Sequence, residues 1–268
     1  SAVFIGCTPI LSIDASTQNV YHFSDTDKNI SLLDISETFG TYDGSFVLYD
    51  NNLDSWKIYD LEEATKRIPP ESTYKIYDAL LGLESGIITP EHSSMTWNGD
   101  AFPFPSWEAD QDLNSAMQNS VNWYFQAIDS QLGINRVQEF LNKIEYGNQT
   151  TSSNLDLYWS DFSLKISPLE QVTLLKKFNT NEFHLNFQNV FSVKNAIKIA
   201  STPNGNFYGK TGTGRVNGQD INGWFIGYVE TSDNSYYFAT NIQSDSNATG
   251  KKAFEITSDI LKKLHIWN

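Results

Sequence analysis

Aromatic and β-branched residues alternate with polar ones near both ends of the chain. Ser45–Tyr49 and Trp56–Tyr59 show this pattern, and the residues between them, Asp50-Asn51-Asn52, are typical of a turn, so we expect a β-hairpin here. Three more segments near the carboxyl end are strand-like and separated by glycine and asparagine: Phe207–Lys210, Gly223–Glu230 and Tyr236–Ile242.

Apolar residues recur at helical spacing in the middle of the chain and in its last segment. The expected helices are Gln111–Leu132, Asn135–Ile144, Pro168–Phe178, part of Phe187–Ala200, and Lys251–Leu264. Before the third of these, Ser167, Pro168 and Glu170 take the N-cap, N1 and N3 positions of a capping box.

The order of elements predicts the fold class. Strands, then many helices, then strands and a last helix indicate an α+β protein: an antiparallel sheet flanked by terminal helices, with an inserted all-helical subdomain. We expect residues 1–38 to be a signal remnant, tether and leader, because Thr8–Glu37 is polar and lacks a clear period, and residues 39–268 to fold.

The amino-acid composition excludes several kinds of function and site. The chain has 268 residues, 18 basic and 32 acidic, for a net charge of -14, so its surface repels polyphosphate and anionic lipid; we expect no nucleic-acid partner. A single cysteine excludes a disulfide framework. The four histidines lie far apart without the usual ligand spacing, so we expect no metal site.

The amino-terminal segment Ser1–Cys7 is apolar and ends in the only cysteine. Three interpretations remain open for it. It resembles the tail of an export signal at a lipid-attachment cysteine, apart from the bulky Phe4. It also fits the end of a longer transmembrane helix whose beginning is missing, or a strand with a buried thiol. No run within the chain approaches the roughly 20 apolar residues of a membrane span.

A candidate nucleophile lies in Ser72-Thr73-Tyr74-Lys75. Prolines precede it and apolar residues follow at helical spacing, so Ser72 should lie at a helix amino terminus, where free N–H groups favour a developing alkoxide. Lys75, three residues on, projects from the same face. A hydroxyl beside an amine is the minimum for an activated serine. Alone, the pattern occurs by chance in many chains and more often marks an N-cap serine with a solvated lysine.

A second candidate element is the glycine-rich strand around Lys210-Thr211-Gly212-Thr213. Its glycines would let another backbone approach closely, and its lysine and hydroxyls suit a carboxylate ligand. We expect the backbone N–H groups of Ser72 and Thr213 to form an oxyanion hole. Taken alone, the segment also fits a glycine-rich turn.

Three smaller features lie between these two. Ser120-Val121-Asn122 is within the helical block, where Ser120 could pass a proton from Lys75 to a leaving nitrogen, although a solvated polar pair fits equally well. Tyr146-Gly147-Asn148 follows a helix and fits a carboxyl-terminal cap. Trp159 by itself would be a core aromatic residue.

Together these motifs resemble a known family. Their order and spacing are similar to those of the class D serine β-lactamases, and equally to the penicillin-sensing extracellular domains of the receptors that induce β-lactam resistance in Gram-positive bacteria. The resemblance covers roughly Gly40–Leu264 and implies a serine β-lactamase or penicillin-binding transpeptidase-like fold for residues 39–268. The motifs that carry it are Ser72–Lys75, Ser120–Asn122, Tyr146–Asn148, Trp159 and Lys210–Gly212.

The resemblance implies a mechanism. Ser72 would attack the β-lactam carbonyl and become acylated, and Lys75 would take up carbon dioxide to form a carbamate that acts as general base; no other cofactor is expected. Carbon dioxide uptake needs a neutral amine, which burial of Lys75 would supply. The family also implies that Trp159 holds the carbamate and that Ser120 and Lys210 take part in catalysis. Lys251 or Lys252 would bind the substrate carboxylate. The remaining substrate-binding residues implied are Asn122, Thr211, Gly212 and Thr213.

One departure bears on function. Most class D hydrolases have an apolar residue at the position of Asn122, whereas the sensor domains often have Asn or Thr. An amide beside Lys75 would compete with the carbamate and leave a long-lived acyl-protein. Ser160, where the enzymes often have leucine, is a second departure. The primary hypothesis is a class D β-lactamase located outside the cytoplasm, secreted or membrane-anchored through Cys7 or a missing segment.

Two alternatives stay open. The first is a receptor's β-lactam-sensing domain, which would be acylated once at Ser72 without turnover. The second is a D-alanyl-D-alanine peptidase or transpeptidase, favoured only by the Ser-x-Asn pattern of Ser120–Asn122.

Overall fold

The computed structural model describes residues 29–268. The interpretations of Ser1–Cys7 therefore lie outside the described residues. The strands are β1 Ile30–Leu32, β2 Asp43–Asp50, β3 Ser55–Tyr59, β4 Lys198–Thr202, β5 Gly205–Val216, β6 Gln219–Glu230 and β7 Ser235–Gln243.

Helices occupy mainly the stretch between β3 and β4. They are α1 Ser36–Phe39, α2 Leu61–Thr65, α3 Lys75–Glu84, α4 Leu113–Gln118, α5 Asn122–Leu132, α6 Ile134–Ile144, α7 Pro168–Asn179, α8 Phe187–Ala196 and α9 Gly250–Lys263, with 3₁₀ turns at Glu71–Tyr74 and Pro105–Trp107. Within residues 29–268, none of these helices combines the length and apolar character needed to cross a bilayer.

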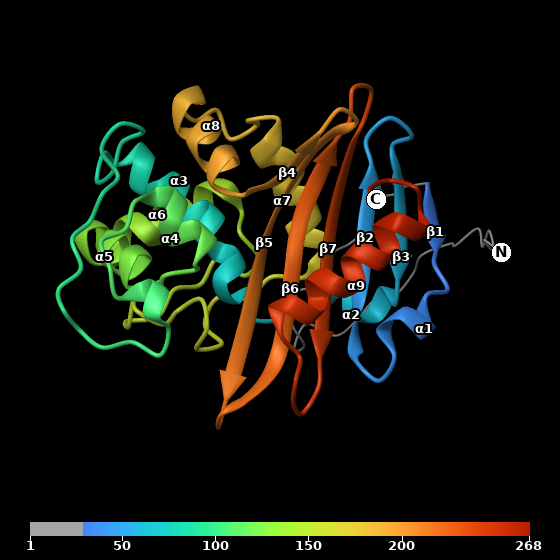
Figure 1. Ribbon diagram of the computed structural model, residues 1–268, viewed down its shortest axis with the longest axis horizontal. Coiled ribbons are helices and arrows are strands. Elements are labelled where there is room, and N and C mark those ends of the chain that lie inside the picture. Colours follow the sequence, from blue (N-terminus) through green and yellow to red (C-terminus); the bar gives the residue numbers. More distant parts are fainter. Residues whose placement is uncertain (1–28) are drawn as a thin grey trace.

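The strands form one sheet in the order β1-β3-β2-β7-β6-β5-β4. All neighbouring pairs are antiparallel except β1 with β3. The expected hairpin is confirmed, with Phe46 opposite Tyr59. On its other side Phe46 lies opposite Thr240, so strands from the two ends of the chain meet at the centre of the sheet (Figure 1).

Helices cover both faces of the sheet, and the remainder form a separate group. Figure 1 shows α9 lying across β6 and β7, and α3, α4, α5, α6 and α8 gathered beside the sheet. One apolar cluster joins the sheet to the helical group, and a second, including Phe225 and Ile256, lies beneath α9. This arrangement confirms the expected α+β class with a helical insertion.

The capping box before α7 is confirmed and also anchors the segment leading to Ser72. Ser167 Oγ accepts from Glu170 N at 3.2 Å, and Glu170 Oε2 accepts from Ser167 N at 2.9 Å. The same carboxylate binds Arg67 Nε at 3.0 Å. Next to it, Ile68 forms a bridge with Ile166. The chain is therefore fixed to α7 only a few residues before the candidate nucleophile.

Two expectations differ from the structure. Gln111–Leu132 is not one helix: α4 ends at Gln118 and α5 begins at Asn122, with Ser120 between them at φ +54°. Residues 30–38, assigned to the leader, instead contribute β1 and most of α1. Both elements are short and depend on contacts with distant residues; beside β1, for example, Leu33 N donates to Ile58 O at 2.8 Å. The hydrophobic pattern of a short segment does not reveal such contacts.

Candidate active site

Ser72 lies in the 3₁₀ turn that leads into α3, as the preceding prolines predict. The residues before it are held from two sides. Pro69 O accepts from Trp224 Nε1 of β6 at 2.8 Å, and Glu71 N donates to Trp159 O at 3.0 Å. Glu71 itself has a φ of +52°, a conformation that costs a non-glycine residue about 1 kcal/mol or more. The surrounding contacts therefore fix the nucleophile's backbone.

The predicted hydroxyl–amine pair is present. Lys75 Nζ donates to Ser72 Oγ at 2.8 Å and to Asn122 Oδ1, at the start of α5, at 2.7 Å. Its ammonium position lies 5.4 Å from the ring centre of Trp159 and 5.6 Å from that of Phe125. Lys75 is thus enclosed between a hydroxyl, an amide and two aromatic rings.

Burial sets the charge of Lys75, which is 1% exposed. Removal from water lowers the pKa of its amine to about 7, while the negative charges of Asp78, Glu71 and Asp129 act in the opposite direction. A large fraction of the amine is therefore neutral at neutral pH. The neutral form can accept a proton from Ser72.

Ser120, between α4 and α5, and Lys210, on β5, form a second pair. Lys210 Nζ, on β5, donates to Ser120 Oγ and to Thr211 O, each at 3.0 Å. Burial, followed by the positive charge of Lys75, holds the pKa of Lys210 well below its usual value. The break between α4 and α5 presents the Ser120 hydroxyl to this lysine.

Gly212 brings β5 against the nucleophile's backbone. A Cβ on Gly212 would lie 3.2 Å from both Ser72 N and Pro70 O, so only glycine allows this approach without displacement. The next residue, Thr213, accepts a hydrogen bond from Gly250 N at its Oγ1, 2.9 Å away. The arrangement is consistent with an oxyanion hole at Ser72 N and Thr213 N, which stays a prediction.

Gly212→Val should therefore slow acylation at least tenfold by displacing the nucleophile's turn. Overpacking of a tight contact costs about 1–3 kcal/mol, so the melting temperature should also fall. Stopped-flow acylation and calorimetry measure the two effects. Acylation at the wild-type rate would contradict the importance of this approach.

Other predicted residues lie less centrally. Lys251 is exposed, and Lys252 Nζ forms an exposed ion pair with Glu255 at 3.0 Å, so neither is held toward Thr211; their carboxylate role stays a prediction. Gly147 abuts the Lys165 carbonyl at φ +49°, and the preceding Tyr146 packs edge-on against Tyr74, in the nucleophile's turn, with 5.2 Å between the ring centres.

Among the described residues, three buried acids whose charges act on Lys75 were not predicted from the sequence: Glu71, Asp78 and Asp129. Burial raises the pKa of Glu71 to about 8, although its hydrogen bond from Asn222 and the charge of Lys75 oppose this. The only sequence signal is that each acid stands next to apolar residues within a motif or predicted helix.

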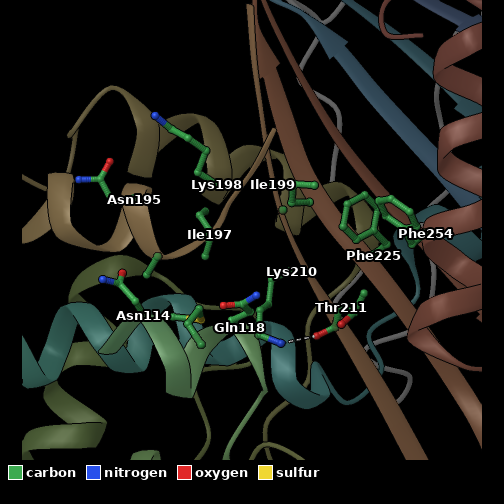
Figure 2. Close-up of a pocket in the computed structure, with 13 residues that line it drawn as sticks. Asn114, Gln118, Asn195, Ile197, Lys198, Ile199, Lys210, Thr211, Phe225 and Phe254 are labelled. Atoms are coloured by element: carbon green, nitrogen blue, oxygen red, sulfur yellow. Dashed lines mark hydrogen bonds between the residues drawn. The ribbon is translucent and has the colours of Figure 1, made fainter. Parts of the chain in front are cut away.

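A pocket of about 530 Å³ adjoins Lys210 and Thr211. Figure 2 shows its other walls, with Asn114 and Gln118 from α4 and Ile197 at the α8–β4 junction. Its lining mixes amide and apolar side chains, a composition typical of small-molecule sites.

Comparison with known proteins identifies the protein family of this chain. The family described as penicillin binding protein transpeptidase domain matches residues 42–262, and the chain belongs to this family. Its fold and paired serine–lysine site agree with that assignment. β-Lactam binding is therefore the activity that the family implies.

Individual relatives indicate which members of the family this chain is similar to. The chain is 45% identical to the regulatory protein BlaR1 of Bacillus licheniformis, over 97% of this chain and 43% of that protein, so it spans less than half of its relative's length. The solved C-terminal domain of the B. licheniformis BlaR penicillin-receptor superposes with a TM-score of 0.87 at 46% identity, covering 90% of this chain and 98% of that one. The class D β-lactamase BAT-2 superposes at 0.82 with 36% identity, covering 88% and 97%.

Proposed function

We propose that this chain is a β-lactam-sensing domain, located outside the cytoplasm, that is acylated at Ser72 and releases the product very slowly. The observation that carries this proposal is the 2.7 Å hydrogen bond from Lys75 Nζ to Asn122 Oδ1. The greater similarity to the BlaR penicillin-receptor domain than to BAT-2 supports it. The sensing domain, rather than the β-lactamase of the primary hypothesis, is thus the favoured function.

The acylation step uses groups already in contact. Neutral Lys75 takes the proton of Ser72 Oγ, 2.8 Å away, as this oxygen bonds to the β-lactam carbonyl carbon. The carbonyl oxygen gains negative charge, which the N–H groups of Ser72 and Thr213 would stabilise. The ring C–N bond then breaks, and its nitrogen receives through Ser120 the proton that Lys75 took from Ser72, which returns the amine to its neutral form; Lys210 holds the Ser120 hydroxyl.

Deacylation requires a base that activates water, and this is where Asn122 acts. Lys75 has the buried amine that carbon dioxide uptake requires, so its chemistry fits a carbamate. The Asn122 amide oxygen, however, accepts a hydrogen bond from the same nitrogen and stabilises the amine. Without the carbamate the only base beside the ester is the Lys75 amine, which stays hydrogen-bonded to Asn122, and the acyl group is therefore expected to leave Ser72 very slowly.

One experiment tests the proposal. The protein is mixed with excess penicillin and bicarbonate, and both hydrolysis and intact mass are followed. A single stable adduct without continuing hydrolysis is expected. Many turnovers with a transient adduct would overturn the proposal and establish a β-lactamase, the second candidate, which the superposition with BAT-2 favours. Cleavage of a D-alanyl-D-alanine peptide would instead establish a peptidase.

Asn122→Val should raise carbamate occupancy and accelerate deacylation at least tenfold, because it removes the amide that competes for Lys75 Nζ. NMR with ¹³C-labelled bicarbonate measures the carbamate, and decay of the adduct mass measures deacylation. Asn119→Val, at the C-cap of α4, provides a control. An unchanged carbamate signal would show that the amide does not determine the state of Lys75.

A further inference from the structure

A pair of buried acids lies between α3 and α5, close to Lys75. Asp78 follows Lys75 by three residues and so lies on the same face of α3. Asp129 belongs to α5, the helix that also supplies Asn122. Both acids are fully buried, with 0% of their surface exposed. The acylation mechanism above does not use either group.

The hydrogen bonds of this pair are incomplete. Tyr158 Oη donates to Asp129 Oδ1 at 3.2 Å. Within residues 29–268, no N–H or hydroxyl group donates to either Asp78 oxygen or to Asp129 Oδ2. The helices that carry them, α3 and α5, pack together, and the two carboxyl groups lie near enough for each to alter the pKa of the other. Two carboxylates repel, so their proximity is favourable only when one of them carries a proton.

The charge of the pair depends on its surroundings. Burial raises the pKa of Asp78 to about 7, while the neighbouring Asp129 and the charge of Lys75 oppose this rise. Burial also raises the pKa of Asp129 well above its usual value, and the negative charge of Asp78 adds to this rise. Near neutral pH the pair therefore holds at least one proton and gains a negative charge as the second leaves. The groups that face the pair or Lys75 are Glu71 and Tyr74 from the nucleophile's turn, Tyr158 and Asp156 from the segment after α6, and Lys210 from β5.

We propose that Asp78 and Asp129 form a proton-sharing pair that stabilises the ammonium form of Lys75 and opposes its conversion to a carbamate. This inference rests on the proposed sensing function and deepens it, because it names a second cause of slow deacylation beside Asn122. Both aspartates are positioning residues that act through Lys75.

The charges of the ammonium and the carbamate explain why the aspartate pair favours the ammonium. In carbamate formation the neutral amine nitrogen bonds to the carbon of carbon dioxide and releases one proton to solvent, and the product is an anion. A buried carboxylate nearby attracts an ammonium and repels this anion, and the low local dielectric strengthens both effects. Ionisation of the pair therefore shifts the equilibrium toward the ammonium and away from the carbamate.

The test needs no β-lactam, so its outcome is separate from that of the proposed function. In Asp78→Asn/Asp129→Asn, ¹³C-bicarbonate NMR should show about tenfold more carbamate at low bicarbonate, which corresponds to a pKa of Lys75 lower by about one unit. Asp50→Asn, at a buried acid on β2 that accepts from Asn234 at 2.8 Å, is the matched control and should leave the signal unchanged. A folded double variant with wild-type carbamate occupancy would overturn the proposal.

A second measurement covers failure of the double variant to fold. The infrared difference spectrum between the wild type and Asp78→Asn should contain the C=O band of a protonated carboxyl group, lost in the variant because the introduced amide can donate to Asp129. Subtraction removes the contribution of Glu71. If the spectrum lacks this band at pH 6, the pair shares no proton and the proposal fails.

Discussion

Ser72→Ala should abolish covalent attachment of a β-lactam. The hydroxyl removed is the acceptor of the 2.8 Å hydrogen bond from Lys75, and it lies in the 3₁₀ turn that leads into α3, where free N–H groups favour an alkoxide. Intact mass after incubation with excess penicillin should show the unmodified protein only. Alanine retains the helical preference, so the fold should be kept.

A matched control is Ser258→Ala, on α9, whose hydroxyl donates to Phe254 O of its own helix at 2.9 Å. This variant should acquire the adduct at the wild-type rate. An adduct on Ser72→Ala with the mass of one penicillin would show that another side chain is the nucleophile and would remove the basis of the proposed function.

Acylation should depend on pH through Lys75. Burial lowers the pKa of its amine to about 7, and only the neutral form can take the proton of Ser72. The acylation rate should therefore rise about tenfold per pH unit below pH 7 and level off above it. Rapid-quench mass spectrometry between pH 5 and pH 9 measures this profile.

Lys75→Met should remove the pH-dependent rise and slow acylation by about 10²–10⁴-fold, the usual contribution of a positioned base. Lys177→Met, which removes a surface ion pair with Glu145, should leave rate and profile unchanged. A rise centred near pH 10 in the wild type would mean that Lys75 is solvated and is not the base at neutral pH.

Local patterns were sufficient for most of the elements. The hairpin of β2 and β3, the capping box at Ser167 and the amphipathic α9 each follow from spacing within a dozen residues. Ser72 and Lys75 were predicted for the same reason, since three residues on one helix fix their separation.

The family resemblance brought Ser120, Trp159 and Lys210 to the site, but the break between α4 and α5 and the buried acids, which depend on distant partners, were not predicted. Ser120 interrupts a regular apolar pattern, and its left-handed backbone is compensated by the hydrogen bond from Lys210, ninety residues away. Asp78 and Asp129 were assigned to no role, because an acid within an amphipathic helix is expected to face water. Their burial becomes evident only when α3 and α5 are packed together.

The central pairing of β2 with β7 has a consequence for biosynthesis. Phe46 meets Thr240, so nearly two hundred residues must be produced before this ladder can form, and the Thr213 side chain gains its partner Gly250 later still. Such long loop closure makes assembly slow and places it after synthesis of β7. A nascent chain halted before α9 would carry Ser72 and Lys75 without the scaffold that aligns them, and we expect it to be inert toward penicillin.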